Sequence, residues 1–251
     1  MPSNIQQWLL TVLLVSVRIV PTLAFSPPFT LMRIPATVRV LVSLTLAASL
    51  VAATPPMESI GSSAISLLVL LAGELLIGIG MALALQLAFA ALLTAGRTID
   101  LQAGYAFALI ADPTSRTQMP LIGMMLAYAA AAIFFATEAP SDLLAVWALS
   151  LEKAPLGAAL GGDGLAVLSA YMSAVFVMAF GVGGLLLLVL FLIDLAITLM
   201  SRTLPQMNVL FMGFQVKALA TLILLPAVFG GSAALMLRMI RFALETMLDL
   251  I

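Results

Sequence analysis

The chain has 251 residues, of which 64% are hydrophobic and 8% are charged, and its ten basic and eleven acidic residues give a formal net charge of −1. A soluble domain is about 45–50% apolar and about 25% charged, and a fold of this size cannot bury so much apolar surface. The composition therefore predicts an integral membrane protein, and it excludes intrinsic disorder and a basic surface for nucleic acid.

Six apolar segments follow one another along the chain and predict one all-α membrane domain over residues 1–251. A helix that crosses the hydrocarbon of a bilayer needs about 20 apolar residues. The stretches between charges predict helices at 5–26, 36–54, 64–97, 118–137, 164–200 and 207–237. Strands of a membrane barrel would alternate in polarity, whereas residues 185–190 read LLLLVL, so helices are expected.

The third and fifth segments are too long for one simple span. They are expected to tilt, to break, or to extend beyond the bilayer. The glycines at 73, 78, 80, 181, 183 and 184 are expected to be break points or close-packing points. Pro21 and Pro226 lie inside apolar segments, where proline removes a backbone hydrogen bond, so each is expected to kink or end its helix.

Three charged residues lie inside apolar segments: Arg18, Glu74 and Asp194. Such residues are costly in a membrane and are functional candidates by default. For Glu74 and Asp194 two interpretations stay open. One is a proton relay or an interhelical ion pair, and the other is a position near a helix end that contacts water or a partner arginine. Glu74 has no second carboxylate at i+3 or i+4 with which to form a relay.

The segment after the third helix is the most unusual in the chain. Arg97 and Asp100 are three residues apart and can pair on one helix face or pair with a partner subunit. The following residues are too polar for a span that faces lipid and too apolar for an ordinary surface loop. Irregular backbone at membrane depth is tolerated only inside protein or along a cavity. We therefore predict a pore plug within residues 102–112, and the alternative is an ordinary interhelical loop with a packed aromatic ring. The predicted plug residues are Gln102, Gly104, Tyr105, Phe107, Leu109 and Ile110.

The C-terminal tail carries a stripe of charges on otherwise apolar helix faces. Arg238, Arg241, Glu245 and Asp249 follow one another at spacings of 3, 4 and 4 residues. The order runs from basic to acidic, which opposes the helix dipole. Packing against a partner or an interface is therefore expected, unless the stripe is simply the end of the last helix.

No catalytic residue set is expected, because the chain contains no His and no Cys. Their absence removes the commonest general base, the commonest zinc ligand, thiolate metal sites and any Ser-His-Asp triad. We predict no metal site, no cofactor and no enzymatic activity.

Four short motifs occur in the order and spacing of a known family. They are RIPATVRV at 33–40, GELLIG at 73–78, AGRTIDLQAG at 95–104 followed by Asp-Pro at 112–113, and SRTLPQMNV at 201–209. The chain thereby resembles the FliR/SctT family of type III secretion export-gate subunits, and its PQ-x-N and Q-x-G details are similar to the flagellar branch. The chain departs from the family pattern in two ways: the aliphatic residues 109–110 follow the two aromatic rings, and Ala103 stands where methionine is common.

The resemblance implies a subunit of a helical export-gate assembly in the bacterial inner membrane, at the flagellar basal body. Its implied partners are FliP-like, FliQ-like and FlhB-like subunits besides membrane lipid, and its implied substrates are unfolded exported polypeptides. It also implies that the loop plugs the closed pore. The alternative function is a proton-coupled secondary transporter in which Glu74 and Asp194 couple proton movement. Such a carrier often has repeated halves, and the sequence shows no repeat.

Overall fold

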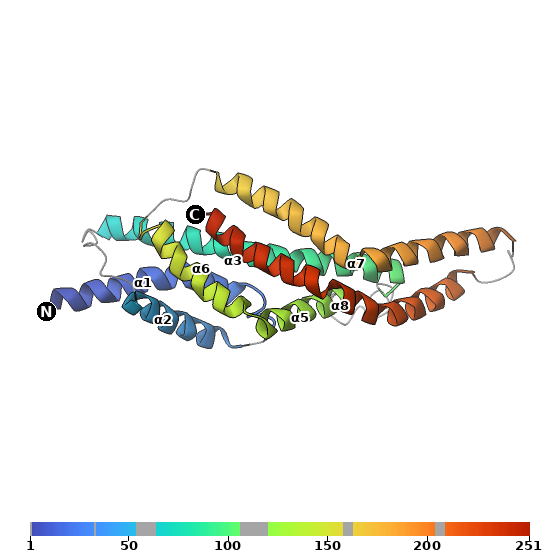
Figure 1. Cartoon of the computed structure of the whole chain (residues 1–251), viewed down its shortest axis with the longest axis horizontal. Helices are drawn as coiled ribbons and strands as arrows, with labels where there is room; N and C mark the ends of the chain where they lie inside the picture. The colour runs from blue at the N-terminus through green and yellow to red at the C-terminus, as the bar shows by residue number, and fades with distance from the viewer. Residues whose placement is uncertain (1, 33, 54–63, 106–119, 158–162, 204–208) are drawn as a thin grey trace. The chain divides into compact units, whose positions relative to one another are not determined.

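The computed structural model describes residues 2–32, 34–53, 64–105, 120–157, 163–203 and 209–251, and the regular secondary structure within these ranges is helical (Figure 1). The prediction of an all-α fold with long apolar helices is confirmed. The helices are α1 (Pro2–Phe25), α2 (Ala36–Ala53), α3 (Ala64–Ala103), α5 (Leu121–Ala136), α6 (Ala139–Lys153), α7 (Gly164–Thr203) and α8 (Val209–Asp249).

The long helices are continuous. α3 and α7 have 40 residues each and α8 has 41, which corresponds to about 60 Å per helix at a rise of 1.5 Å per residue. The hydrocarbon of a bilayer is about 30 Å thick, so these helices tilt or extend beyond it. Of the alternatives for these segments, a break that ends the helix at the glycines of α3 or α7 does not occur. α1 and α8 also continue through Pro21 and Pro226, so neither proline ends its helix.

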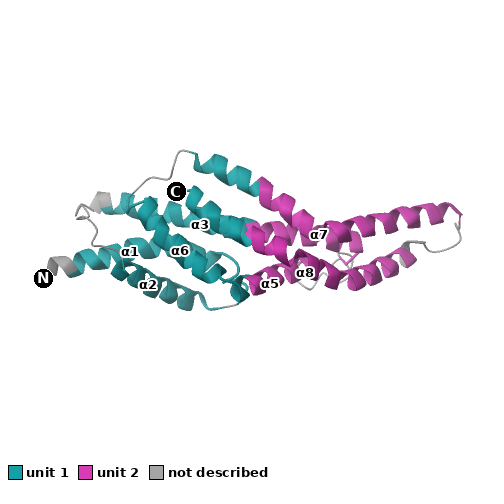
Figure 2. Ribbon diagram, viewed as in Figure 1, with its two compact units in different colours: residues 1–87, 134–172, 240–251 teal, residues 88–133, 173–239 magenta. Residues whose placement is uncertain are grey.

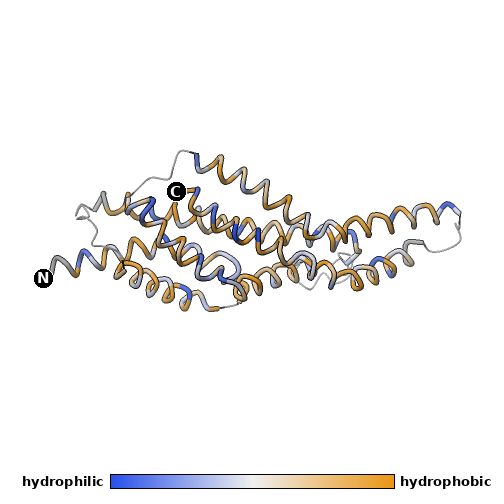
Figure 3. The backbone as a smooth tube through the Cα atoms, viewed as in Figure 1, coloured by the Kyte–Doolittle hydropathy of each residue, from blue (hydrophilic) through white to orange (hydrophobic). Residues whose placement is uncertain are grey.

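Five helices of the described part of the chain are long and apolar enough to cross a membrane: α1, α2, α3, α7 and α8. α5 and α6 meet at a bend of 74°, and they make a sixth candidate span if the bent pair is counted as one. Hydrophobic residues predominate along these helices (Figure 3). This pattern is typical of helices that are surrounded by lipid or by other apolar helices.

α6 has no counterpart among the six predicted segments. It begins with Pro140 in its first turn, where the missing N–H of proline is harmless. Asp142 near its beginning and Lys153 in its last turn both suit the helix dipole. Its inner face buries Leu143 and Trp147. The segments were predicted from stretches without charges, and the charged residues of α6 interrupt such a stretch.

The chain forms two compact units (Figure 2). Unit 1 contains residues 1–87, 134–172 and 240–251, and unit 2 contains residues 88–133 and 173–239. Within unit 1, α1 packs against α2. Each unit has its own buried core. Core side chains include Leu14, Ile19, Met81, Leu85, Trp147 and Met247 in unit 1, and Phe89, Ile99, Leu126, Val175, Leu186 and Met236 in unit 2.

Much apolar surface stays uncovered on two helices. α2 buries only Ser43 and Ala47 and leaves Leu41 61% exposed. α7 exposes Leu188 and Phe191 by more than half of their surface. Exposed apolar surface of this extent requires contact with lipid or with another protein.

Candidate functional site

A buried ion pair joins α1 to α3 inside unit 1. Nε of Arg18 lies 2.6 Å from Oε2 of Glu74, and both side chains are almost completely buried. Gly78 lies one turn after Glu74. A Cβ added there would lie 2.5 Å from the carbonyl oxygen of Arg18 and 3.0 Å from Cγ of Pro21. Only glycine therefore allows the two helices to approach closely enough for this ion pair to form.

The same arginine also caps the C-terminal end of α6. Its Nη1 donates to the carbonyl oxygen of Ser150 at 2.8 Å, and its Nη2 donates to that of Ala154 at 3.0 Å. The last carbonyl groups of a helix have no partner within the helix. The second carboxylate oxygen of Glu74 accepts the N–H of Gly157 at 3.0 Å. The Arg18–Glu74 pair of α1 and α3 thus satisfies three backbone groups at the end of α6 and in the turn after it, and these contacts in turn satisfy the two buried charges.

Gly157 has a φ of +90°, a backbone conformation that residues with a Cβ rarely adopt. A Cβ there would lie 2.4 Å from Cδ2 of Leu70. The partner of Glu74 is thus Arg18. The contacts of this pair with Ser150, Ala154 and Gly157 were not predicted from the sequence. Contacts through backbone groups leave no pattern in residue types, although a glycine just after a helix is a weak signal.

Asp100 is buried in unit 2 and contacts α5. Both of its carboxylate oxygens lie 3.1 Å from the backbone nitrogen of Ile122, in the first turn of α5. The first N–H groups of a helix lack partners and carry partial positive charge, so the carboxylate caps α5. The structure does not join Asp100 to Arg97, whose side chain is exposed. A pairing of Arg97 with another subunit stays a prediction.

α3 and α5 are in backbone contact beside this cap. A Cβ added to Gly96 would lie 2.1 Å from Cα of Gly123, and one added to Gly123 would lie 2.8 Å from the carbonyl oxygen of Leu93. Two facing glycines therefore set the distance between these helices. That short distance lets Asp100 hold the amide of Ile122 directly.

The first residues of the predicted plug are fixed against α8. α3 ends at Ala103, and Gly104 follows with a φ of +89°. A Cβ on Gly104 would lie 2.4 Å from the Phe214 ring, so that ring covers the glycine. The hydroxyl of Tyr105 donates to the carbonyl oxygen of Ala218 at 3.2 Å. Burial raises the pKa of Tyr105 and the negative charge of Asp100 raises it further, so the phenol keeps its proton.

The remaining predicted plug residues, Phe107, Leu109 and Ile110, lie outside the described residues. Gln102 is half-buried in the last turn of α3. Asp194, the other intramembrane carboxylate, forms an ion pair with Lys217 that joins α7 to α8 within unit 2. Each of the two candidate coupling carboxylates therefore has a basic partner. Within the described residues, no group of three acidic side chains is placed to hold a metal ion.

The sequence matches a known family over most of its length. A profile of the family described as "Bacterial export proteins, family 1" matches residues 9–243. Three similar proteins are each named flagellar biosynthetic protein FliR. The Bacillus subtilis protein is 28% identical over 182 residues, which are 71% of this chain and 70% of the relative. The Escherichia coli protein is 30% identical over 142 residues, which are 56% of this chain and 54% of the relative.

The third relative, from Pectobacterium carotovorum subsp. carotovorum, is 29% identical over 178 residues, which are 70% of this chain and 66% of the relative. The family match is consistent with the helices of the chain that are long and apolar enough to cross a membrane. The chain therefore belongs to family 1 of the bacterial export proteins, the family of the FliR proteins.

Proposed function

We propose that this protein is a non-enzymatic subunit of the flagellar type III protein export gate. In this proposal it contributes to the pore and to its plug, and unfolded flagellar polypeptides pass through the pore. FliP-like, FliQ-like and FlhB-like subunits are its partners in the bacterial inner membrane, at the flagellar basal body. Membership of the export family and the names of its relatives support the flagellar export role.

The anchoring of Gly104 and Tyr105 carries the plug proposal. α3 ends at a glycine with positive φ, and the next side chain is bonded to α8. The apolar sequence AFALI at 106–110 therefore starts from a fixed point. An apolar constriction blocks ions by excluding water, and it needs no covalent or metal link that a passing polypeptide would have to break.

The ion pairs of the two intramembrane carboxylates argue against a proton-coupled carrier. A coupling carboxylate must gain and lose its proton during transport. Glu74 is held by Arg18 and the amide of Gly157, and Asp194 is held by Lys217. Both carboxylates are therefore bound by basic partners within this chain, which is expected of structural residues.

Replacement of residues 106–110 by a flexible Gly-Ser sequence of equal length tests the plug. This change retains Gly104 and Tyr105 and removes only apolar bulk. Membranes that contain the complex of the altered chain with its partner subunits are expected to conduct ions at rest, whereas the intact complex does not. The matched control is the same replacement at residues 158–162, which should leave the conductance unchanged. Normal assembly of the altered complex without an ion leak would place the seal in another subunit.

A further inference from the structure

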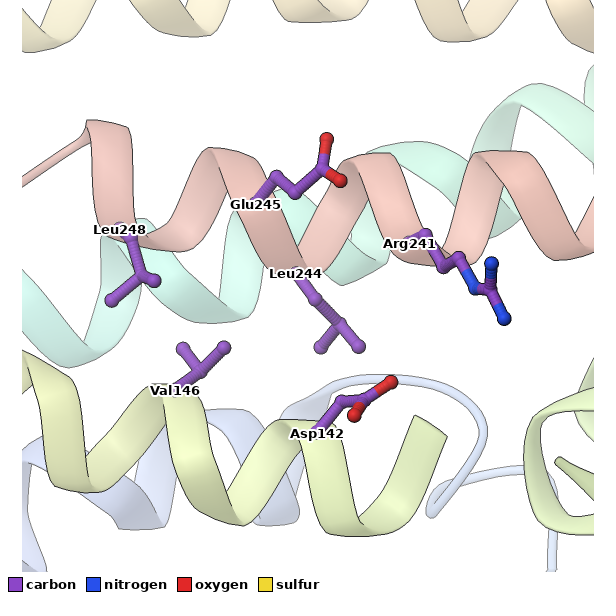
Figure 4. Close-up of a pocket in the computed structure, with 6 residues that line it drawn as sticks. All are labelled: Asp142, Val146, Arg241, Leu244, Glu245 and Leu248. Carbon is purple, nitrogen blue, oxygen red and sulfur yellow. The ribbon is translucent and has the colours of Figure 1, made fainter. Parts of the chain in front are cut away.

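A groove of about 230 Å³ lies between α6 and α8 in unit 1 (Figure 4). Its floor is apolar: Val146 and Leu244 are buried, and Leu248 is half-buried. Asp142 and Arg241 lie at one end, and Glu245 lies on the outer side of α8. Pockets for drug-sized ligands measure about 300–1,000 Å³. The groove is smaller, and its size suits one apolar side chain better than a free small molecule.

The acidic residues beside the groove are in an unfavourable local position. Glu245 and Asp249 are four residues apart on α8, so their like charges repel each other. Both lie in the last turns of the helix, where negative charge opposes the dipole. Both are exposed, and neither forms an ion pair with another described residue. The nearby amine of Lys153 donates instead to the carbonyl oxygen of Leu248.

We propose that a helix of another export-gate subunit docks on this groove. One of its apolar side chains packs against Val146, Leu244 and Leu248. A lysine or arginine one turn away on the same helix contacts Glu245 and Asp249 and relieves their repulsion. This inference rests on the proposed function, because it requires the chain to work within an assembly.

Charge complementarity selects a basic helix over a lipid. The phosphate of a lipid head group would be repelled by the two carboxylates of α8. An acyl chain would cover the apolar floor but would bring no positive charge to Glu245 or Asp249, neither of which forms an ion pair with Arg241 or with another described residue. A basic residue on a partner helix supplies the counter-charge for both carboxylates. Its aliphatic stem can cover apolar surface beside the floor of the groove.

Photo-crosslinking in the co-expressed complex tests this docking. The chain carries the photoreactive exchange Leu248→p-benzoylphenylalanine and is expressed with the FliP-like, FliQ-like and FlhB-like subunits. Crosslinks are expected to one helix of one of these subunits, next to a lysine or arginine. Glu245→Lys together with Asp249→Lys should lower the crosslink yield roughly tenfold, because two attractive contacts become repulsive.

The matched control is Glu152→Lys, which reverses an exposed charge on α6 that does not line the groove. It should leave the crosslink yield unchanged. Reversing the charge of the crosslinked basic residue should restore the yield in the Glu245→Lys, Asp249→Lys chain. High salt should weaken the crosslink of the unreversed chain as well, and this measurement does not depend on the folding of a charge-reversed variant.

Two results would overturn the docking proposal. One is an assembled complex in which position 248 crosslinks only to lipid. The other is a crosslink whose yield responds neither to charge reversal nor to salt. Failure of the unaltered chain to co-purify with any of the three subunits would instead contradict the proposed function, and the docking proposal would fail with it.

Discussion

Arg18 connects three helices of unit 1. Its guanidinium joins α1 to α3 and to the end of α6, and no water is available to replace a lost partner at a fully buried position. A buried pair is weak evidence of net stabilisation, yet the loss of one partner leaves an uncompensated charge. Replacing one of the two residues therefore destabilises the fold more than replacing both with apolar residues.

Arg18→Met and Glu74→Gln are each expected to destabilise the folded chain by about 3–5 kcal/mol. The double variant Arg18→Met, Glu74→Gln should lose less than the sum of the two single changes, because it leaves no unpaired charge. Unfolding of the detergent-purified chain measures these differences. The control is Arg238→Met, which removes an exposed arginine. Additive losses in the double variant would show that the two residues act independently.

Asp100 and Arg97 are expected to respond differently to substitution. Asp100→Ala removes a charged cap from α5 and should cost about 1–3 kcal/mol. Arg97 is exposed, so Arg97→Ala should change the stability of the isolated chain by less than about 0.5 kcal/mol. The same unfolding measurement checks both. An equal loss in the two variants would contradict the capping role that distinguishes Asp100.

At the scale of the helices, close packing depends on a few glycines. Gly96 of α3 and Gly123 of α5 bring two backbones into contact, while Gly184 of α7 has no neighbouring atom within 4 Å of an added Cβ. The same amino acid thus has opposite roles at two positions within helices. At the first it permits contact, and at the second it only lowers helix propensity.

Gly96→Ala is expected to separate α3 from α5 and to destabilise the chain by more than about 2 kcal/mol, because the new methyl group meets backbone rather than a flexible side chain. Gly184→Ala, the matched control, should stabilise α7 by about 0.5–1 kcal/mol. Circular dichroism during thermal unfolding measures both. Gly96→Ala with unchanged stability would contradict the contact between the two backbones.

The sequence predicted the apolar helices well and the charged ones poorly. Charge-free stretches located α2, α5 and α7 to within a few residues. α3 was expected to end at Arg97 but continues to Ala103, because Asp100 finds its partner on another helix. α6 was missed because its own charges interrupted the apolar pattern. Rules based on charge fail where a charge is satisfied by tertiary contacts.

The sequence predicted which charged residues belong to the candidate site, but not which groups they contact. Arg18, Glu74 and Asp194 stood out because charges are rare in apolar segments. Their pairing could not be predicted, since Arg18 and Glu74 are 56 residues apart in the chain. The carbonyl groups that complete the Arg18 cluster belong to Ser150 and Ala154, and every residue carries such a group. Only the fold selects these two.

For the whole molecule, the uncovered apolar surface of α2 and α7 predicts dependence on partner subunits. Co-expression with FliP-like and FliQ-like subunits is expected to raise the yield of folded chain in detergent several-fold and to give one monodisperse complex. Size-exclusion chromatography of the chain with and without its partners makes this comparison. A carrier that works alone would instead be equally stable and monodisperse without them, and that result would contradict the subunit role.

The buried Arg18 cluster also constrains how the protein is made. Ribosomes release α1 before α3 and α6, so Arg18 enters the insertion machinery 56 residues ahead of Glu74 and more than 130 residues ahead of Ser150. An arginine at the centre of an inserting helix costs about 2.5–3.5 kcal/mol. α1 therefore enters lipid at a cost that persists until α3 brings Glu74 to Arg18. The order of synthesis thereby delays the full set of Arg18 contacts until the end of α6 has been made.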